Sequence, residues 1–552
     1  MSTTPRILSL ASLLTFSTAA LSHAGGGITL QPKAGAPLQG LTADELALFE
    51  TGKILFATPP TIEQGLGPIF NKSNCQSCHS VPTGGWGSIT VTRFGLEKKG
   101  EFVEYPGEVQ SLLQAEAISE SCREILPADA TVVSLRVTNS SLAFGIVDAI
   151  ADADIIANGD PTDADGDGIS GKVHYVDVLE DPTGGLRPGR FGWKAQVATL
   201  FSFSGDATRN EMGFTNSLVP SENPPNGDYA LLAQCDVASD PEDVPDAAGF
   251  TFIERVTHFQ RFLGMPPQTP KVGMTGEAIF NQVGCAKCHI RDWQTPNDPS
   301  LAEALRGQNA KIYSDFLLHD MGTLADGIQQ GDANEFEFRT PVLWNLATRD
   351  PMLHDGRVAG GTFAERVTAV IVAHGPFGEG AASAAAFSAL SEGEKGQLVS
   401  FLRSLGRLEF DADFSGVIDI VDFYSFWSCA NIAIAPDDEC AVHDINASGS
   451  LEPDDLSMFL QAWGGPADDC DANSFPDAID IALDASLDSN GDGILDSCST
   501  CPADLDGNGS VDGSDLATLL SGWGGSDADI DGSGTVDGQD LAQMLSAWGP
   551  CA

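Results

Sequence analysis

The sequence predicts a mainly α-helical chain in which two similar domains precede a series of short helical repeats. A five-residue motif occurs twice, and its last residues, at positions 79 and 289, are 210 residues apart. Up to Glu409 the chain is rich in Gly and Pro, with short helical patterns separated by long loops. After Glu409, an acidic loop followed by an apolar helical pattern recurs. A length of 552 residues is consistent with three or four domains.

Residues 1–24 predict a secretory signal. Arg6 lies in a short n-region, an apolar run covers 7–20, and small residues at 22–24 form the cleavage exit. The apolar run is too short for a transmembrane helix and is interrupted by Ser and Thr, and nothing else in the chain approaches 18 apolar residues. We therefore expect an exported protein, periplasmic, cell-surface or secreted, without a membrane span.

Two copies of the pattern C-x-x-C-H predict two covalently bound haem c groups. Two thiols three positions apart can add to the two vinyl groups of one haem, while the adjacent imidazole coordinates the iron as proximal ligand. The alternative for each copy is a disulfide or a zinc half-site followed by an unrelated His. The expected haem residues are Cys75, Cys78 and His79 in the first motif and Cys285, Cys288 and His289 in the second.

The residues that precede the two motifs are also alike. Segments 67–74 and 276–284 both contain Ile-Phe-Asn, and both look helical. This similarity indicates an internal repeat. We expect an N-terminal haem domain over 25–265 and a C-terminal haem domain over 266–409.

The eight remaining cysteines form an even set, which predicts disulfides in an oxidising compartment. Cys122 and Cys235 are the expected pair in the haem region, because no other cysteine outside the motifs lies there. Pairing among the other six has 15 possibilities, and the sequence does not choose among them. These six are Cys429, Cys440, Cys470, Cys498, Cys501 and Cys551.

A change in charge marks the start of the last region, 410–552. Residues 411–552 contain 29 Asp or Glu and no Lys or Arg, so over half of the net charge of −50 lies in this quarter of the chain. Such acidity argues against binding to nucleic-acid phosphates. An acidic stretch of this length requires either disorder or bound cations.

The spacing of the acidic residues favours bound calcium. In residues 504–515, oxygen-bearing side chains occupy loop positions 1, 3, 5, 9 and 12 and Gly509 provides the turn at position 6, as in an EF-hand with Asp in place of the last Glu. Four loops share this pattern. The expected calcium ligands are Asp411, Asp413, Ser415, Asp419, Asp422, Asp444, Asn446, Ser448, Glu452, Asp455, Asp504, Asp506, Asn508, Asp512, Asp515, Asp529, Asp531, Ser533, Asp537 and Asp540.

Each loop runs into a short amphipathic helix, expected at 423–427, 456–463, 516–523 and 541–548, with apolar residues at i, i+3, i+4 and i+7. We expect the last two units to pack as one calcium-stapled pair. On these residues the tail resembles dockerin-type calcium repeats, whose loops also end on Asp, and the resemblance implies a docking partner at the cell surface. The acidic run at 488–496 resembles the calcium repeats of thrombospondin-like stalks, with a solvated acidic linker as the alternative.

Longer motifs in the haem region carry a second resemblance. They are YSDFLLHDMG (313–322), EFRTPVLW (337–344), LHDGR (353–357), GRFGWKA (189–195) and DADGDGISG (163–171). These motifs occur along the chain in the order typical of the di-haem oxidoreductase family, also called di-haem thiol oxidoreductases, and the resemblance covers roughly residues 40–408. More distantly, they are similar to bacterial di-haem cytochrome c peroxidases and MauG.

The resemblance implies a mostly helical pair of cytochrome c-like domains whose haem planes face a shared interface. In the peroxidases one haem stores or relays an electron, and the other has an open or labile sixth position where peroxide is cleaved. The implied partners are a redox electron donor, either a protein or a quinol-linked cytochrome, and peroxide or another small oxidant.

The supply of sixth iron ligands differs between the motifs. No His or Met lies between His79 and His174. The sixth coordination position of the first haem iron is therefore either open or occupied by a residue distant in sequence. The second motif is followed by His319, Met321, Met352, His354 and His374, of which the resemblance selects His374; His354 is expected to orient a propionate or a loop. The distant candidates for the first haem are His174, Met212, His258 and Met265.

Two arginines and a tryptophan complete the predicted site. Arg339 and Arg357 suit haem propionates, because guanidinium groups match carboxylates, with ion pairs elsewhere as the alternative. Trp193 either relays electrons or packs as a buried aromatic. Glu116 and Glu120, on a helical-looking stretch, are acid–base candidates by position alone.

The leading hypothesis is an exported di-haem c-type oxidoreductase that reduces peroxide, with a calcium-binding docking tail. The alternative is a non-catalytic electron-transfer cytochrome, tethered outside the cell by the same tail, in which both irons are six-coordinate. The number of sixth ligands distinguishes the two hypotheses.

Overall fold

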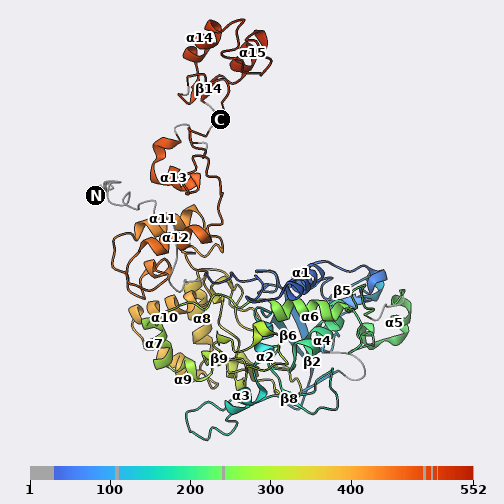
Figure 1. The fold of residues 1–552 in the computed structure, drawn as a ribbon. Helices are drawn as coiled ribbons and strands as arrows, with labels where there is room; N and C mark the ends of the chain where they lie inside the picture. The colour runs from blue at the N-terminus through green and yellow to red at the C-terminus, as the bar shows by residue number, and fades with distance from the viewer. Residues whose placement is uncertain are drawn as a thin grey trace. The chain divides into compact units, whose positions relative to one another are not determined.

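The structure is a computed structural model that describes residues 30–105, 111–238, 243–488, 491, 493–498, 501–506 and 508–550. The predicted signal, 1–24, and Cys551 lie outside these residues. The described chain forms two compact units, one over Gln31–Glu409 and the other from Phe410 onward (Figure 1). Among the described helices, none combines the length and the apolar character that crossing a bilayer requires.

Short helices joined by long loops dominate the first unit, in agreement with the prediction of a helix-rich chain. Several begin with a capping box, in which Thr or Ser at the N-cap and Glu three residues later exchange hydrogen bonds, as at Thr42 and Glu45. The helices are α1 (Ala43–Ala57), α2 (Phe144–Ala149), α3 (Asp152–Ala157), α4 (Leu200–Met212), α5 (Tyr229–Cys235), α6 (Phe252–Phe262), α7 (Thr275–Gln282), α8 (Phe363–Ala373), α9 (Ala381–Ser388) and α10 (Glu392–Ser404).

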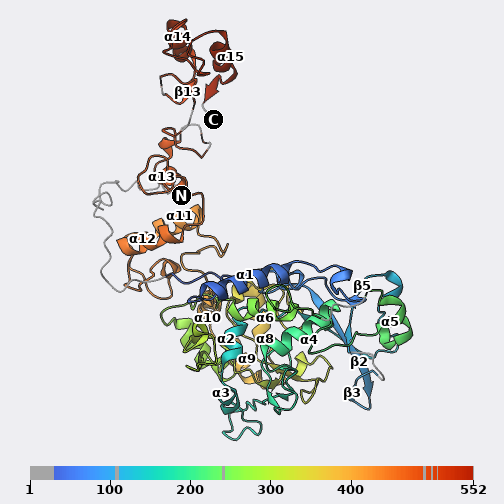
Figure 2. The same ribbon diagram turned by 45° about the vertical axis from the view of Figure 1, so that its right-hand side comes forward.

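Two crossed helix pairs carry the internal repeat. α1 packs on α6 (Figure 2), and α7 packs on α10 (Figure 1). Each contact has a glycine at the crossing: a Cβ on Gly52 would lie 2.2 Å from the Arg255 carbonyl oxygen, and one on Gly276 would lie 2.1 Å from that of Gln397. Only glycine permits such a close approach of two helices.

The segment before the first motif is not helical, so that part of the prediction is wrong. Residues Ile69–Phe70 form strand β1, paired with β5 (Glu116–Ala117), while α1 takes the place that α7 has before the second motif. Glu116 therefore lies in a strand and Glu120 in a short 3-10 turn, not on a helix. The first CxxCH motif is reached by a longer connection than the second.

Small antiparallel sheets, which the sequence did not predict, complete the first unit. The largest has β2 (Thr90–Lys98) paired with β3 (Glu101–Val103), β4 (Leu112–Leu113) and β6 (Val132–Val137). The two-stranded sheets are β1 with β5, β7 (Tyr175–Val176) with β8 (Arg187–Pro188), β9 (Asp292–Gln294) with β10 (Asn309–Lys311), and β11 (Leu318–Asp320) with β12 (Glu337–Arg339).

One core joins residues from both predicted haem domains. Ile146, Phe191 and Leu200 share a buried cluster with Trp293 and Trp344. The residues 31–409 are therefore one compact body, and their division into haem domains at residue 265 stays a prediction.

The disulfides agree with the prediction that cysteines outside the two CxxCH motifs pair with one another. The predicted Cys122–Cys235 bond is confirmed, with Cα atoms 5.8 Å apart. The tail contains the pairs Cys429–Cys440 and Cys470–Cys498, and Cys501 is also disulfide-bonded. The four cysteines of the two motifs remain thiols, which argues against the disulfide alternative for them: Cys75, Cys78, Cys285 and Cys288.

The four predicted tail helices are confirmed. Each begins at loop position 9, whose side chain exchanges hydrogen bonds with the Asp at position 12, and this Asp is fully buried in all four units. The last two units share a core that includes Val511, Leu519 and Met544. The tail elements are α11 (Ile420–Ser428), α12 (Pro453–Ala462), α13 (Asp477–Leu483), α14 (Gly513–Ser521), α15 (Gly538–Ser546), and the paired β13 (Ser510–Val511) and β14 (Gly549–Pro550).

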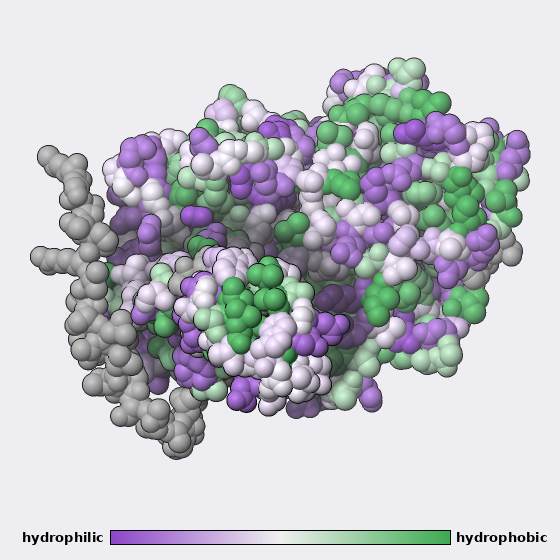
Figure 3. All heavy atoms as spheres, turned by 90° about the horizontal axis from the view of Figure 1, so that it is seen from above, coloured by the Kyte–Doolittle hydropathy of each residue, from purple (hydrophilic) through white to green (hydrophobic). Residues whose placement is uncertain are grey.

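Large apolar side chains remain exposed on the tail helices. Leu520 and Trp523 on or after α14, and Leu545 and Trp548 on or after α15, are each about half exposed. Hydrophobic residues gather into several separate patches on a mixed surface in the space-filling view (Figure 3).

Candidate functional site

The second CxxCH motif faces a large apolar cavity. Cys285, Cys288 and His289 line it, together with side chains from α7, α8 and α10 such as Phe280 and Val367. Most of its lining is apolar, and the two thiols and the imidazole of the motif lie in its wall. A cavity of this polarity suits a flat, apolar cofactor beside the two thiols.

The hydrogen bonding and the protonation state of His289 suit a metal ligand. Its Nδ1 lies 2.9 Å from the Tyr313 carbonyl oxygen and donates to it, which leaves Nε2 as the atom with a free lone pair. Burial lowers the pKa of His289 to about 4, so the ring is neutral at pH 7. A neutral imidazole whose second nitrogen is held by a carbonyl is the usual form of a metal-ligating His.

His374 has the same features and lines the same cavity. It caps the C-terminus of α8, and its Nδ1 donates to the Val370 carbonyl oxygen at 2.8 Å. Burial lowers the pKa of His374. The electrostatic interaction of His374 with His289 contributes to the low pKa of His289. The structure thus brings two neutral imidazoles to one cavity, and this donor set fits an iron with two axial histidines. Met321 and Met352 also line the cavity.

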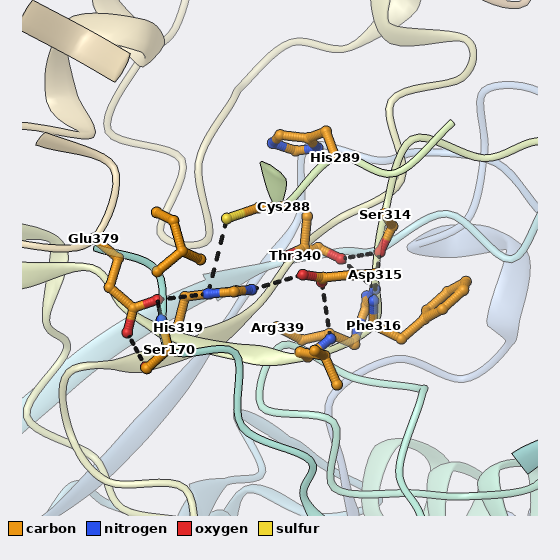
Figure 4. Close-up of polar contacts among 12 residues, drawn as sticks. Ser170, Cys288, His289, Ser314, Asp315, Phe316, His319, Arg339, Thr340 and Glu379 are labelled. Atoms are coloured by element: carbon orange, nitrogen blue, oxygen red, sulfur yellow. Dashed lines mark hydrogen bonds and ion pairs between the residues drawn. The ribbon is translucent and has the colours of Figure 1, made fainter. Parts of the chain in front are cut away.

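His319 is fully engaged by carboxylates and is not free to bind iron. Its Nδ1 lies 2.6 Å from Glu379 Oε2, and its Nε2 lies 2.8 Å from Asp315 Oδ2 (Figure 4). Burial opposes a charge on His319, but Asp315 and Glu379 outweigh it and hold the pKa well above the usual range. His319 is therefore an imidazolium between two carboxylates, in the wall of the cavity and 3.8 Å from Cys288 Sγ.

Arginines line the cavity beside β12. Arg339 donates to the carbonyl oxygens of Gly192 and Thr340, and burial lowers its pKa to about 10. Arg349, which no sequence motif indicates, is also buried, and burial lowers its pKa to about 9. Its Nη2 has no hydrogen-bond partner among the described residues, nor has Nε2 of His354. Such buried donors are satisfied by an anionic ligand group, as haem propionates would provide.

The other predicted arginine is placed differently. Arg357 is about two-fifths exposed, pairs with Asp355 at 2.6 Å and is not among the residues that line the cavity. His354, by contrast, is buried, lines the cavity and stacks on Phe338 with ring centroids 4.1 Å apart.

A stack of aromatic rings around Arg349 links the surroundings of the two motifs. The guanidinium carbon lies 3.9 Å from the Trp86 ring centroid and 5.2 Å from that of Trp193. Trp86 hydrogen-bonds through its backbone to Ser80 and Val81, directly after the first motif. Trp193 lines the second cavity and donates from Nε1 to the Val137 carbonyl oxygen.

The first motif is covered by the end of α4. The backbone N–H groups of Asn71 and Lys72 donate to the Glu211 carbonyl oxygen, and Met212 Sδ lies 3.8 Å from Cys75 Sγ. His79 lies in an apolar environment that includes Phe56, and burial lowers its pKa to about 4. The sequence offers Met212 only as one of four distant candidates, because α4 is more than 120 residues away along the chain.

Glu211 is the carboxyl group that this packing brings to the first motif. Asn71 Nδ2 donates to Glu211 Oε2 at 2.9 Å. Burial raises the pKa of Glu211, and its charge contributes to the raised pKa values of the Cys75 and Cys78 thiols. No sequence pattern near the first motif indicates Glu211, since it lies far from the motif along the chain.

Of the four distant candidates for the first haem, the structure brings Met212 to the motif. His174 is held by the Lys194 carbonyl oxygen and the Asp332 N–H. His258 lies between the rings of Phe250 and Phe262. Met265 packs on the core cluster that contains Trp293.

The tail loops share one hydrogen-bond arrangement. The carboxylate at position 12 accepts from the N–H groups at positions 2 and 9, and the one at position 1 accepts from those at positions 5 and 6, as Asp422 and Asp411 do. Carboxylate oxygens of Asp411, Asp413 and Asp422 lie within 4.8 Å of one another, as do those of Asp160, Asp163 and Asp165.

Comparison with known proteins identifies the family. The family model described as "Di-haem oxidoreductase, putative peroxidase" matches residues 107–405, more than half of the chain. Among solved structures, Kuenenia stuttgartiensis hydrazine synthase under 20 bar xenon is 15% identical, with 70% of this chain and 98% of that chain covered and a TM-score of 0.28. A MauG-like protein associated with microbial copper homeostasis is 14% identical, with 68% and 94% covered and a TM-score of 0.29. No curated protein matches the sequence. On the family match, the chain belongs to the di-haem oxidoreductase family.

Proposed function

We propose that this protein is an exported oxidoreductase that reduces peroxide with electrons passed between two covalently bound haems. The observation that carries the proposal is the contrast between the two motifs. The second faces a cavity with a neutral His374 on its wall, whereas the first is covered by Glu211, a carboxyl group whose pKa is raised. On this proposal the second site would have the two imidazole ligands of an electron carrier, and the first would have a carboxyl group that can donate a proton, as peroxide reduction requires.

A c-type haem supplies an iron that takes up and releases one electron and, where a coordination position is open, also binds peroxide. Four thiols would attach the two haems, and His79 and His289 would be the proximal ligands. His374 would be the sixth ligand at the second site. Arg339 and Arg349 would hold propionates there.

Glu211 would serve as the acid–base group. Because Asn71 Nδ2 donates to Oε2, the Oε1 atom is left to carry a proton. Burial favours this protonated form, since it raises the pKa of the carboxyl group. A carboxyl group in this state can give a proton to a departing oxygen and take one back from water.

The Trp86–Arg349–Trp193 stack would connect the two sites electronically. Both rings lie within about 6 Å of the guanidinium, the range of cation–π contacts. The positive charge between the rings disfavours the removal of an electron from either of them. The stack would therefore pass electrons without holding an oxidised tryptophan.

The tail would bind calcium at its four loops and attach the enzyme to a partner outside the cell. This proposal is supported by the arrangement of carboxylates, which is the same in each loop. Calcium prefers oxygen ligands of this type. The exposed Leu and Trp side chains on α14 and α15 would contact the partner.

A second candidate function is electron transfer without catalysis. It is favoured by the position of Met212, whose sulfur is close to Cys75 and is chemically able to be a sixth ligand. If Met212 bound the first iron, peroxide would have no open position.

The test is a single-turnover titration of the fully reduced holoprotein with hydrogen peroxide. One peroxide takes up two electrons and two protons to give two waters, so one equivalent should oxidise both haems. The reaction should be complete within seconds at micromolar peroxide. Two haems that stay reduced on this timescale would contradict the proposal and favour the electron-transfer cytochrome.

A further inference from the structure

The loop between α8 and α9 connects His374 to a fixed point on β11. Residues 375–380 follow His374 directly, and three of them are glycines. Glu379 N–H donates to the Asp320 carbonyl oxygen at 2.9 Å. Gly322 lies so close to this loop that a Cβ on it would clash with the Phe377 carbonyl oxygen. Because glycines give a loop high conformational freedom, the loop requires contacts of this kind to keep one conformation.

The Glu379 side chain makes most of these contacts. Its carboxylate accepts from His319 Nδ1 at 2.6 Å, from Ser170 N–H at 3.1 Å and from Asp320 N–H at 3.3 Å. The Ser170 hydroxyl also donates to it. The hydrogen bonds from His319 and Ser170 outweigh burial and lower the pKa of Glu379 to about 2. A single carboxylate thus joins three segments that are distant in sequence.

His319 places this junction beside the second CxxCH motif. Its other nitrogen is held by Asp315, and its ring reaches to 3.8 Å from Cys288 Sγ (Figure 4). Residues on both sides of the junction, His374 and Glu379 among them, line the same cavity. The charged group at one end of the loop and the candidate iron ligand at the other are five residues apart.

We propose that Glu379 is a positioning residue that, through His319 and Ser170, keeps the 374–380 loop in place so that His374 remains on the second haem iron. This inference rests on the proposed role of His374 as sixth ligand. Glu379 does not itself touch the iron. Without its contacts the glycine-containing loop gains conformational freedom, and His374 dissociates more often.

The experiment compares the ferric holoproteins of the wild type and of Glu379→Ala, with Glu392→Ala, at an exposed side chain of α10, as a control. Cyanide binding by stopped flow measures how often the second iron loses its ligand, and EPR measures the low-spin fraction. Glu379→Ala should bind cyanide at the second haem at least 10-fold faster, with faster amide exchange over 374–380. Ser170→Ala, which removes one hydroxyl contact, should give a smaller increase, about 3-fold, and Glu392→Ala none.

His374→Gly separates the two proposals. If it converts the second haem to a high-spin form that added imidazole reverses, His374 is the ligand; an unchanged spectrum would overturn both the ligand assignment and the role of Glu379. If His374→Gly behaves as expected but Glu379→Ala binds cyanide at the wild-type rate, only the positioning role is wrong. Should Glu379→Ala contain less than two haems per chain, Glu379→Gln, which keeps the shape, replaces it with the same expectations.

Discussion

The two CxxCH motifs share a helical scaffold but differ in what covers them. Around the second, α7 and α10 cross at Gly276 and the adjoining cavity is lined by His374 and a buried ion-pair network. Around the first, α1 and α6 cross at Gly52 in the same way, but the covering element is the end of α4, with Glu211 and Met212. A repeated scaffold thus combines with different neighbouring side chains, because those side chains come from elements outside the repeat, and on the proposed function this difference would give the two sites different roles.

The largest effect is expected from Glu211→Gln, which tests the assignment of the first site. The amide keeps the shape of the side chain but cannot carry the proton. We expect the rate of peroxide reduction to fall by about 10²–10⁴-fold, the usual contribution of acid–base catalysis. The control is Glu120→Gln, whose side chain is 86% exposed and should leave the rate unchanged. A Glu211→Gln rate within 3-fold of wild type would show that the two sites do not differ as proposed.

The ion-pair network of the second site should appear in the pH dependence of stability. The pKa of His319 is raised on folding, so its contribution is complete below its unfolded pKa, about 6.5, and is lost as the pH rises through the folded value. The pKa of Glu379 is lowered to about 2, so its contribution is lost as the pH falls toward 2.

His319→Gln should therefore destabilise most between about pH 4.5 and 6.5, by about 3 kcal/mol, the scale of a broken buried pair. Urea unfolding of wild type and variant across this range measures the difference. A destabilisation that grows above pH 8 would contradict the charged state of His319.

The shared scaffold can be tested with matched glycine substitutions. Gly52→Ala and Gly276→Ala would each place a Cβ about 2 Å from a backbone oxygen. Each should lower the free energy of unfolding by about 2 kcal/mol, as overpacking does. Gly393→Ala on α10, where a Cβ meets nothing within 4 Å, should be neutral or slightly stabilising. Unequal losses of unfolding free energy in the two variants would show that the helix pairs are not equivalent.

The smallest effect on the haem sites is expected from calcium removal. EGTA should lower the unfolding temperature of the tail, because a ligand at 100 times its Kd stabilises a site by about 2.7 kcal/mol. The Soret spectrum of residues 31–409 should stay unchanged, since the haem unit and the tail are separate compact units. Calorimetry and absorption on the same sample provide both measurements, and a tail transition that EGTA leaves unmoved would argue against calcium.

What the sequence predicts depends on how local the signal is. The CxxCH motifs, the tail helices and the Cys122–Cys235 bond follow from spacing within short windows or from counting. Glu211 and Arg349 could not be found in this way, because long-range packing brings them to Asn71 and Trp86. For the same reason the sequence indicates Arg357 and gives no sign of Arg349, although of these two only Arg349 lines the cavity.

The most direct test of the contrast between the two sites is the EPR spectrum of the ferric holoprotein before and after hydrogen peroxide. We expect one low-spin haem with two histidine ligands and one high-spin haem, and only the high-spin signal should change when peroxide is added. Two low-spin signals, both unaffected by peroxide, would contradict this expectation.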